Sequence, residues 1–152
     1  MNQKIVLLRP ALSFAILKNI NLIILTIMIL ILSVFINVHE IAFASIVPAI
    51  LLIYRIMYWR MVKYEISSSQ IKYTRGVFQI NIDFLEMYRI KDFDQRQSLV
   101  MRLLSIMHIH LMTSDITHPV LELKGIPKSN IADVLRKLVL KSRKENRVYE
   151  VD

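Results

Sequence analysis

The feature that most constrains this chain is a long apolar run near its N-terminus. Residues 22–36 contain no charged side chain, and the run reaches twenty residues if it extends from Asn19 to Val38. At about 1.5 Å per residue, a helix of that length matches the roughly 30 Å hydrocarbon core of a bilayer. The sequence therefore predicts a helix that spans a membrane.

A second apolar run, residues 41–58, follows after only four residues and carries one charge, Arg55. So short a connection forces the two helices to lie antiparallel, which predicts a membrane hairpin within residues 19–59. Tyr58 and Trp59 are expected at the lipid headgroups, where aromatic side chains gather, and Arg55 can extend to the same surface. Pro48 is expected to kink the second helix.

Ser45 and Ala49 form a pair of small residues four positions apart, which lets another helix approach closely in a membrane. The favoured interpretation is packing against the first helix of the same hairpin, and the alternative is packing against another chain. The order Ala42, Phe43, Ala44 also resembles a signal-peptide cleavage site. The preceding apolar stretch is longer than a usual signal sequence and cleavage would discard a span, so an anchor is favoured.

Basic residues flank the hairpin on one side only, and the connecting turn has none. Cytoplasmic loops of membrane proteins are enriched in lysine and arginine, so both termini are expected in the cytoplasm of a bacterial cell, with the hairpin in its inner membrane. Residues 1–18 form a basic, apolar lead-in. Either the first span starts near Leu12, or an interfacial helix that begins near Pro10 precedes the span, which is favoured. The flanking basic residues are Lys4, Arg9, Lys18, Arg55, Arg60 and Lys63.

Composition agrees with a membrane part followed by a folded part. The net charge of +8 is not a sign of nucleic-acid binding, because residues 1–60 hold five basic residues against one acidic, and the positive-inside rule already explains that half of the excess. The chain has no cysteine, which excludes disulfides, zinc–thiolate sites and cysteine nucleophiles. We divide it into residues 1–60 in the membrane part, 61–145 in a cytoplasmic domain and a flexible tail, 146–152.

From Met61 the apolar pattern changes to alternation, which indicates strands with one buried face. Strands are expected around residues 62–66, 71–74, 78–84, 86–95, 107–111 and 121–123, and residues 78–84 show the clearest alternation. A bulge is predicted near Lys91, and Ser98 is expected to cap a short helix over residues 99–104. Residues 125–127 end the sheet, and an amphipathic helix from about Ile131 follows. The result is a compact α+β module or small antiparallel β-barrel with a capping helix.

Short motifs recur in a fixed order along the chain, among them Arg9-Pro10, Tyr64-Glu65-Ile66 and Thr74-Arg75-Gly76. In this order they are similar to the motifs of bacterial pleckstrin-homology-like (PH-like) membrane proteins. The resemblance covers nearly the whole chain and implies a barrel capped by a C-terminal helix, with no catalytic residues. This chain departs from the family pattern after Leu103 and Leu104, where glycines are common and Ser105, Ile106, Met107 and His108 stand instead. The matching motifs are Arg9-Pro10, Tyr64-Glu65-Ile66, Thr74-Arg75-Gly76, Tyr88-Arg89-Ile90, Ser98-Leu99 and Gly125-Ile126-Pro127.

Enzymatic and metal sites have little support in the sequence. His108 and His110 should share one strand face, and His108 is expected near Glu122, but a third firm metal ligand is missing. The two glycines both lie at turns, so no phosphate-binding loop is present. Four acidic residues alternate with basic ones and are interpreted as solvated sheet surface: Asp83, Glu86, Asp92 and Asp94. We expect no catalytic residues, no metal, no cofactor and no small-molecule substrate.

Two binding functions remain. The favoured hypothesis is a membrane-anchored module that recruits a protein partner or assembles with itself. The alternative is a sensor of anionic lipid headgroups. The candidate residues at the lipid and membrane interface are Arg9, Lys18, Arg55, Trp59, Arg60, Lys63, Lys72 and Arg75.

Overall fold

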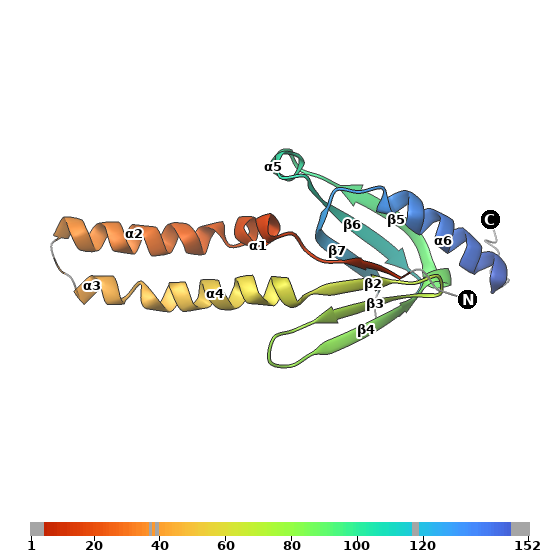
Figure 1. The fold of residues 1–152 in the computed structure, drawn as a ribbon, viewed down its shortest axis with the longest axis horizontal. Helices are drawn as coiled ribbons and strands as arrows, with labels where there is room; N and C mark the ends of the chain where they lie inside the picture. The colour runs from red at the N-terminus through yellow and green to blue at the C-terminus, as the bar shows by residue number, and fades with distance from the viewer. Residues whose placement is uncertain (1–4, 37, 39, 117–118, 147–152) are drawn as a thin grey trace.

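The computed structural model describes residues 5–36, 38, 40–116 and 119–146, and it has two parts. A long helical hairpin projects from one end of a domain made of two antiparallel sheets and a C-terminal helix (Figure 1). The hairpin contains α1 (Leu12–Lys18), α2 (Ile20–Ile36), α3 (Glu40–Phe43) and α4 (Ile46–Met61). The domain contains β1 (Val6–Leu8), β2 (Lys63–Ile66), β3 (Gln70–Arg75), β4 (Asn81–Glu86), the 3-10 turn η1 (Met87–Arg89), β5 (Ile90–Arg96), α5 (Leu99–Leu103), β6 (Ile106–Thr113), β7 (Val120–Pro127) and α6 (Ile131–Glu145).

The hairpin holds one or two candidate membrane spans. The stretch Glu40–Met61 is 22 residues long. Its most apolar 18-residue window has a mean hydropathy of 1.9, and only 11% of that window is buried inside the protein. Helices α1 and α2 are long and apolar enough only when taken together, and they are bent by 62° where they meet. Asn19 causes this break, because its side-chain amide donates to the Ala15 carbonyl (2.8 Å) while its own carbonyl accepts from Leu22 and begins α2. Residues 12–18 are therefore a separate short helix ahead of α2.

Helices α2 and α4 lie side by side (Figure 1). Ser33 on α2, Ser45 at the start of α4 and Pro48 in its first turn are buried. The Ser45 hydroxyl donates to the Ala42 carbonyl at 2.6 Å. The chain bends at Ala44 and Ser45 rather than in mid-helix, so Pro48 lies in a first turn, where its missing N–H leaves no hydrogen bond unmade.

Residues ahead of the hairpin belong to the folded domain, which the sequence analysis missed by treating residues 1–18 as a lead-in. Strand β1 pairs antiparallel with β2, with Val6 opposite Ile66 and Leu8 opposite Tyr64. Because β1 leads into the hairpin and β2 leads out of it, this ladder closes the base of the hairpin. The backbone N–H of Ala11 then donates to the Gly125 carbonyl at 2.8 Å, which ties the same segment to β7.

The strands form two separate sheets, not the closed barrel that the sequence analysis expected. One sheet has the order β1-β2-β3-β4 and the other β5-β6-β7, and η1 carries the chain between them. The described residues contain no ladder that joins the two sheets. A cleft lined by side chains of β3, β4 and β7, including Tyr73, Asp83 and Leu121, lies where backbone hydrogen bonds would have closed a barrel.

The clearest alternating segment of the sequence faces the wrong way for the prediction. Strand β4 begins only at Asn81, and the apolar side chains of residues 78–84 point outward: Phe78 is 90% exposed and Phe84 is 53% exposed. Leu85, which breaks the alternation, faces the core opposite Ile71 of β3. Alternation shows that two faces differ, but only packing decides which face is covered.

Other local predictions are confirmed. The register of β5 shifts between Ile90 and Asp92, as the predicted bulge requires, and Arg143 of α6 donates to the freed Ile90 carbonyl at 2.6 Å. The Ser98 hydroxyl accepts from the Met101 N–H and caps α5. Helix α6 follows the sheet as expected and buries Ile131, Leu135 and Val139. The expected flexible tail begins at Asn146, and residues 147–152 lie outside the described residues.

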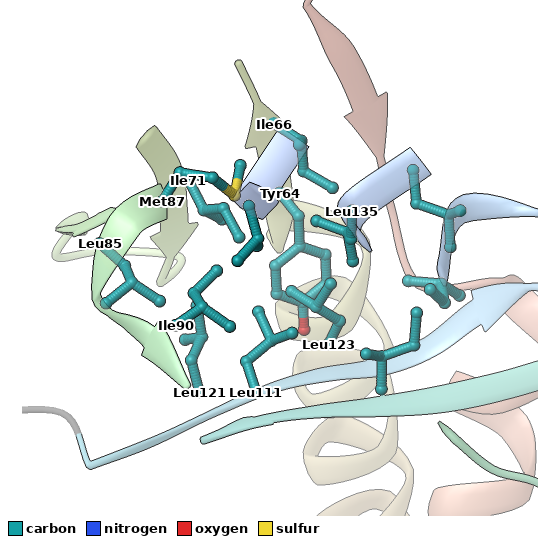
Figure 2. Close-up of a cluster of buried hydrophobic side chains, with 14 of the residues drawn as sticks. Tyr64, Ile66, Ile71, Leu85, Met87, Ile90, Leu111, Leu121, Leu123 and Leu135 are labelled. Atoms are coloured by element: carbon teal, nitrogen blue, oxygen red, sulfur yellow. The ribbon is translucent and has the colours of Figure 1, made fainter. Parts of the chain in front are cut away.

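One apolar core joins the two sheets and α6, and Tyr64 crosses it (Figure 2). The Tyr64 ring projects from β2 toward β7, where its hydroxyl accepts from the Lys124 N–H (3.1 Å) and faces the Glu122 carbonyl (3.4 Å). Burial raises the pKa of the Tyr64 phenol, so it stays a neutral donor and acceptor. Tyr64 also stacks on Tyr73 with ring centroids 5.1 Å apart.

A second, smaller cluster docks α1 onto the domain. Phe14 meets Trp59 of α4 edge to face at 4.9 Å, and it contacts His108 of β6 in the same geometry at 5.2 Å. Its ring lies directly over Gly125, where any side chain would collide with it. Gly125 also has φ +63°, a conformation that disfavours residues with a Cβ.

Gly125→Ala should therefore displace Phe14 and loosen α1 from the domain. We expect a lower thermal unfolding midpoint in detergent and a shifted emission of Trp59, the sole tryptophan. The double variant with Phe14→Ala is the control: without the ring, the added methyl should cost little beyond the strained φ, about 1 kcal/mol. If the stability losses of Gly125→Ala and Phe14→Ala simply add in the double variant, the collision between the new methyl group and the Phe14 ring is contradicted.

Ser105→Gly should stabilise the domain. Ser105 follows α5 with φ +52°, the left-handed conformation that usually ends a helix with glycine. Relief of the Cβ strain, less the extra entropy of an unfolded glycine, should amount to roughly 0.5–1 kcal/mol. A rise in the thermal midpoint checks this, with Ser105→Ala as a control that keeps the strain and should give no rise.

Candidate membrane-interface site

The last turns of α4, where the hairpin enters the domain, carry a basic groove. We call it the Arg9–Arg60 groove. It has a volume of about 520 Å³ and is lined by Arg9, Ile53, Ile56, Met57, Arg60 and Met61. Arg9 comes from the segment between β1 and α1, and the other residues come from one side of α4. Two guanidinium groups thus stand beside an apolar wall, which suits a ligand with an anionic head and an apolar tail.

Another face of the same helix carries a second basic pocket, the Lys18–Arg55 pocket. Its volume is about 320 Å³, and it is lined by Lys18, Asn19, Tyr54, Arg55, Tyr58 and Trp59. The break between α1 and α2 supplies Lys18 and Asn19, while α4 supplies the rest. Three aromatic side chains therefore surround two cationic groups at the end of the hairpin that joins the domain.

The cations of these two sites have no acidic partner within residues 5–36, 38, 40–116 and 119–146. Neither Arg9, Lys18, Arg55 nor Arg60 forms an ion pair there, and no carboxylate lines the groove or the pocket. A cluster of uncompensated positive charge attracts anions and raises their local concentration. Chemically, the arrangement can hold phosphate or carboxylate groups, but it presents no nucleophile with an adjacent base.

The remaining predicted interface residues lie elsewhere on the domain. Lys63 begins β2 opposite Thr74. Lys72 pairs with Glu65 at 3.5 Å, and Arg75 pairs with Asp83 at 3.2 Å and lies over the Tyr73 ring. The structure therefore brings Arg9 together with Arg60, and Lys18 together with Arg55 and Trp59, while Lys72 and Arg75 have acidic partners of their own.

Sequence reasoning missed most of the uncharged residues that line the two sites. The signal was present as helical spacing within α4. Tyr54 and Tyr58 are four residues apart and flank Arg55 and Trp59, whereas Ile53, Met57, Arg60 and Met61 repeat at intervals of three and four on another face. Spacing within α4 could not predict where Arg9 lies, because Arg9 follows β1 and that strand was not predicted from the sequence.

The cleft between the sheets is a third concave region, of about 370 Å³, but its charges are already paired. Arg75 faces Asp83 across β3 and β4, and Lys124 holds Glu122 at 2.6 Å on β7. That hydrogen bond with Lys124 lowers the pKa of the Glu122 carboxyl, and burial raises the pKa of the Tyr73 phenol. We do not assign a ligand to this cleft.

A scan against protein families matches residues 12–142 to the family described as bacterial PH domain (bPH_2). The chain belongs to this bacterial PH domain family. The match begins in α1 and ends in α6, so it includes the helical hairpin as well as both sheets. The family is not a known catalytic one. A comparison with curated proteins gave no match, and a comparison with solved structures gave none either.

The histidine pair of the PH domain differs from the prediction. His110, and not His108, lies beside Glu122, with Nδ1 and Oε1 3.2 Å apart. A register shift between Met107 and Ile109 moves His108 toward Gly125 instead, and its Nδ1 accepts the Gly125 N–H at 2.8 Å. In the part of the chain that the structure describes, no group of three His, Asp or Glu residues could hold a metal.

Three of the four carboxylates singled out in the sequence pair with an arginine, and Asp83 among them also lines the cleft between the sheets. Asp83 pairs with Arg75, Glu86 with Arg89 at 2.8 Å, and Asp94 with Arg96 at 2.8 Å. Asp92 accepts the N–H of Phe93 at 2.7 Å.

The stability of this PH domain should fall in mild acid because of His108. Burial lowers the pKa of the His108 imidazole, and a protonated Nδ1 cannot accept the Gly125 N–H. A histidine whose folded pKa is depressed contributes stability that is present above its unfolded value, near 6.5, and is lost as the pH falls through the folded value. Glu122 acts in a separate window, because its lowered pKa removes stability only below about 4.5.

His108→Gln should reduce the loss of thermal stability between pH 7 and pH 5, because a glutamine oxygen can accept the same N–H without titrating. Melting curves in detergent across that range measure it, and equal midpoints at pH 8 establish that the variant folds. A slope identical to that of the wild type would show that His108 is not the titrating group.

Proposed function

We propose that this protein is a membrane-anchored PH-like interaction module, held at the cytoplasmic face of a bacterial inner membrane. In this proposal, the end of the hairpin that joins the domain contacts anionic lipid headgroups. The observation that carries the proposal is the gathering of Arg9, Lys18, Arg55 and Arg60 around one end of α4 without acidic partners among the described residues. The positive-inside rule supports the orientation, because these cations lie at the end of the hairpin that joins the domain.

The lining of the two sites supports a lipid in preference to a free anion. In the Arg9–Arg60 groove, Met57 and Ile53 lie on α4 at increasing distance from the domain, inside the candidate span. An acyl chain could therefore follow the helix while its phosphate meets the two guanidinium groups. In the Lys18–Arg55 pocket, Trp59 and two tyrosines supply the amphipathic rings that prefer the headgroup region. Each basic residue near an anionic leaflet contributes about 1 kcal/mol.

The full-length chain, purified in mild detergent and examined by native mass spectrometry, tests the lipid contact. With equal amounts of phosphatidylglycerol and phosphatidylcholine added, we expect preferential retention of the anionic lipid, which weakens as ionic strength rises. The double variant Arg9→Gln, Arg60→Gln should lose about tenfold or more in retention, since two contacts of about 1 kcal/mol are removed. Lys137→Gln with Lys144→Gln, on the exposed side of α6, changes the net charge equally and should retain lipid as the wild type does.

If the two double variants retain the lipid equally, net charge alone explains the retention, and a site at the groove is refuted. Absence of any preference for phosphatidylglycerol at low salt would refute the headgroup contact as a whole. Both results can be read from one set of spectra, because the number of bound lipids is counted for each variant.

Recruitment of a protein partner, or self-assembly, is the second candidate function, and the outer face of β4 favours it. Ile82 and Phe84 are 46% and 53% exposed there, on an edge strand that pairs with β3 alone among the described residues. A photo-crosslinking amino acid at Phe84 in native membranes should trap one defined product, whereas the same group at Ser68, in the β2–β3 turn, should not. Only uncrosslinked monomer from both positions would count against this function.

A further inference from the structure

We propose that the domain also rests on the membrane through two apolar feet, one on each side of the hairpin. The first foot is the β3–β4 tip, residues 76–80, and the second is helix α5, Leu99–Leu103. This inference depends on the membrane anchorage proposed above and adds a second mode of contact, in which the bilayer surface covers side chains that lie outside the candidate spans.

The β3–β4 tip is apolar and fully uncovered. Phe78 is 90% exposed and Ile80 is 64% exposed, and residues 76–82 contain no charge. Gly76, with φ +118°, allows the tight tip, because a Cβ there would collide with the Gln79 carbonyl. The nearest charges, Arg75 and Asp83, pair with each other at 3.2 Å at the base of the tip. Such a patch on a protein surface marks an interaction site.

A ring contact fixes the level of this tip along the hairpin. Phe78 stacks on Tyr54 of α4, with ring centroids 6.0 Å apart and ring planes 12° from parallel. Tyr54 lies inside the candidate span Glu40–Met61, seven residues before its domain end, which is about 10 Å along a helix. A bilayer that surrounds α4 to that depth therefore surrounds Phe78 as well.

Helix α5 presents a second apolar surface. Leu99 is 80% exposed, Leu103 is 85% exposed and Val100 is 50% exposed, although leucine and valine are side chains that usually pack inside. The helix turns only Met101 inward, into the small cluster that holds Phe14 of α1. Its leucines thus remain outside, close to the place where the hairpin leaves the domain.

The two feet lie at the same end of the domain and on opposite sides of the hairpin (Figure 1). The apolar layer of a bilayer is flat and extended, so it can cover both feet at once. The same layer would surround α4. A single bound protein would have to reach around the hairpin to do the same. The bilayer is therefore the occupant that the geometry favours, with the feet at the depth where amphipathic segments enter the boundary of headgroups and acyl chains.

Such a three-point contact limits how far the domain can tilt on its hairpin. It also keeps the Arg9–Arg60 groove and the Lys18–Arg55 pocket at headgroup level, since both lie around the part of α4 that the feet flank. The apolar feet and the basic groove thus both contact the same bilayer surface.

Site-directed spin labelling of the full chain in phosphatidylglycerol-containing vesicles tests the feet. The chain has no cysteine, so single substitutions Phe78→Cys and Leu103→Cys label the two feet, and Ile80→Cys and Leu99→Cys repeat each measurement. These side chains are exposed, so the labels should leave the fold intact, which the emission of Trp59 checks. Ser68→Cys, in the turn at the far end of β2, reports water, and Leu30→Cys, in α2, reports the hairpin.

We expect labels on both feet to collide freely with oxygen and to meet a water-soluble nickel complex at least severalfold less often than the label at Ser68. Nickel accessibility at the feet equal to that at Ser68, with Leu30 still shielded from nickel, would overturn the feet and leave the anchorage standing. Nickel access at Leu30 would overturn the anchorage itself, and the feet with it. Shielding from both reagents, with spin–spin broadening that vanishes on dilution with unlabelled chain, would assign the feet to a second copy and overturn the proposal.

Discussion

The rest of the structure depends on the antiparallel pairing of β1 with β2. These strands are the segments that enter and leave the helical hairpin, and their ladder holds Val6 against Ile66 and Leu8 against Tyr64. A flexible linker on either side would let the hairpin swing freely. Instead, the two segments that connect the helices to the domain are hydrogen-bonded strands of one sheet, so the hairpin and the domain are joined by two connections at once.

Docking of α1 adds a second connection, to the other sheet. The Ala11 N–H reaches the Gly125 carbonyl of β7, and the Phe14 ring fills the space above Gly125 and against Trp59. His108 supports the same point by accepting the Gly125 N–H. One glycine is thus the place where the lead-in helix, the end of α4 and β6 converge, and its lack of a side chain is what permits the approach.

The surface around this junction combines charge with exposed apolar area. Positive charge on Arg9, Lys18, Arg55 and Arg60 gathers at one end of α4, and exposed apolar side chains on the β3–β4 tip and α5 flank the same end. In the proposed orientation, anionic headgroups would meet the cations, and the boundary of the acyl chains would meet the apolar groups.

The sequence by itself determined the apolar hairpin, the order of strands and helices after it, the bulge at β5, the Ser98 cap and the family resemblance, because each of these is encoded in neighbouring residues. Only the tertiary structure decided that residues 6–8 are a strand, that the sheets stay open between β4 and β7, and that the alternating side chains from Phe78 to Phe84 face outward. It also decided that His110 meets Glu122. These outcomes depend on register and on which face another element covers, and such contacts join residues far apart in the chain, where local pattern carries no information.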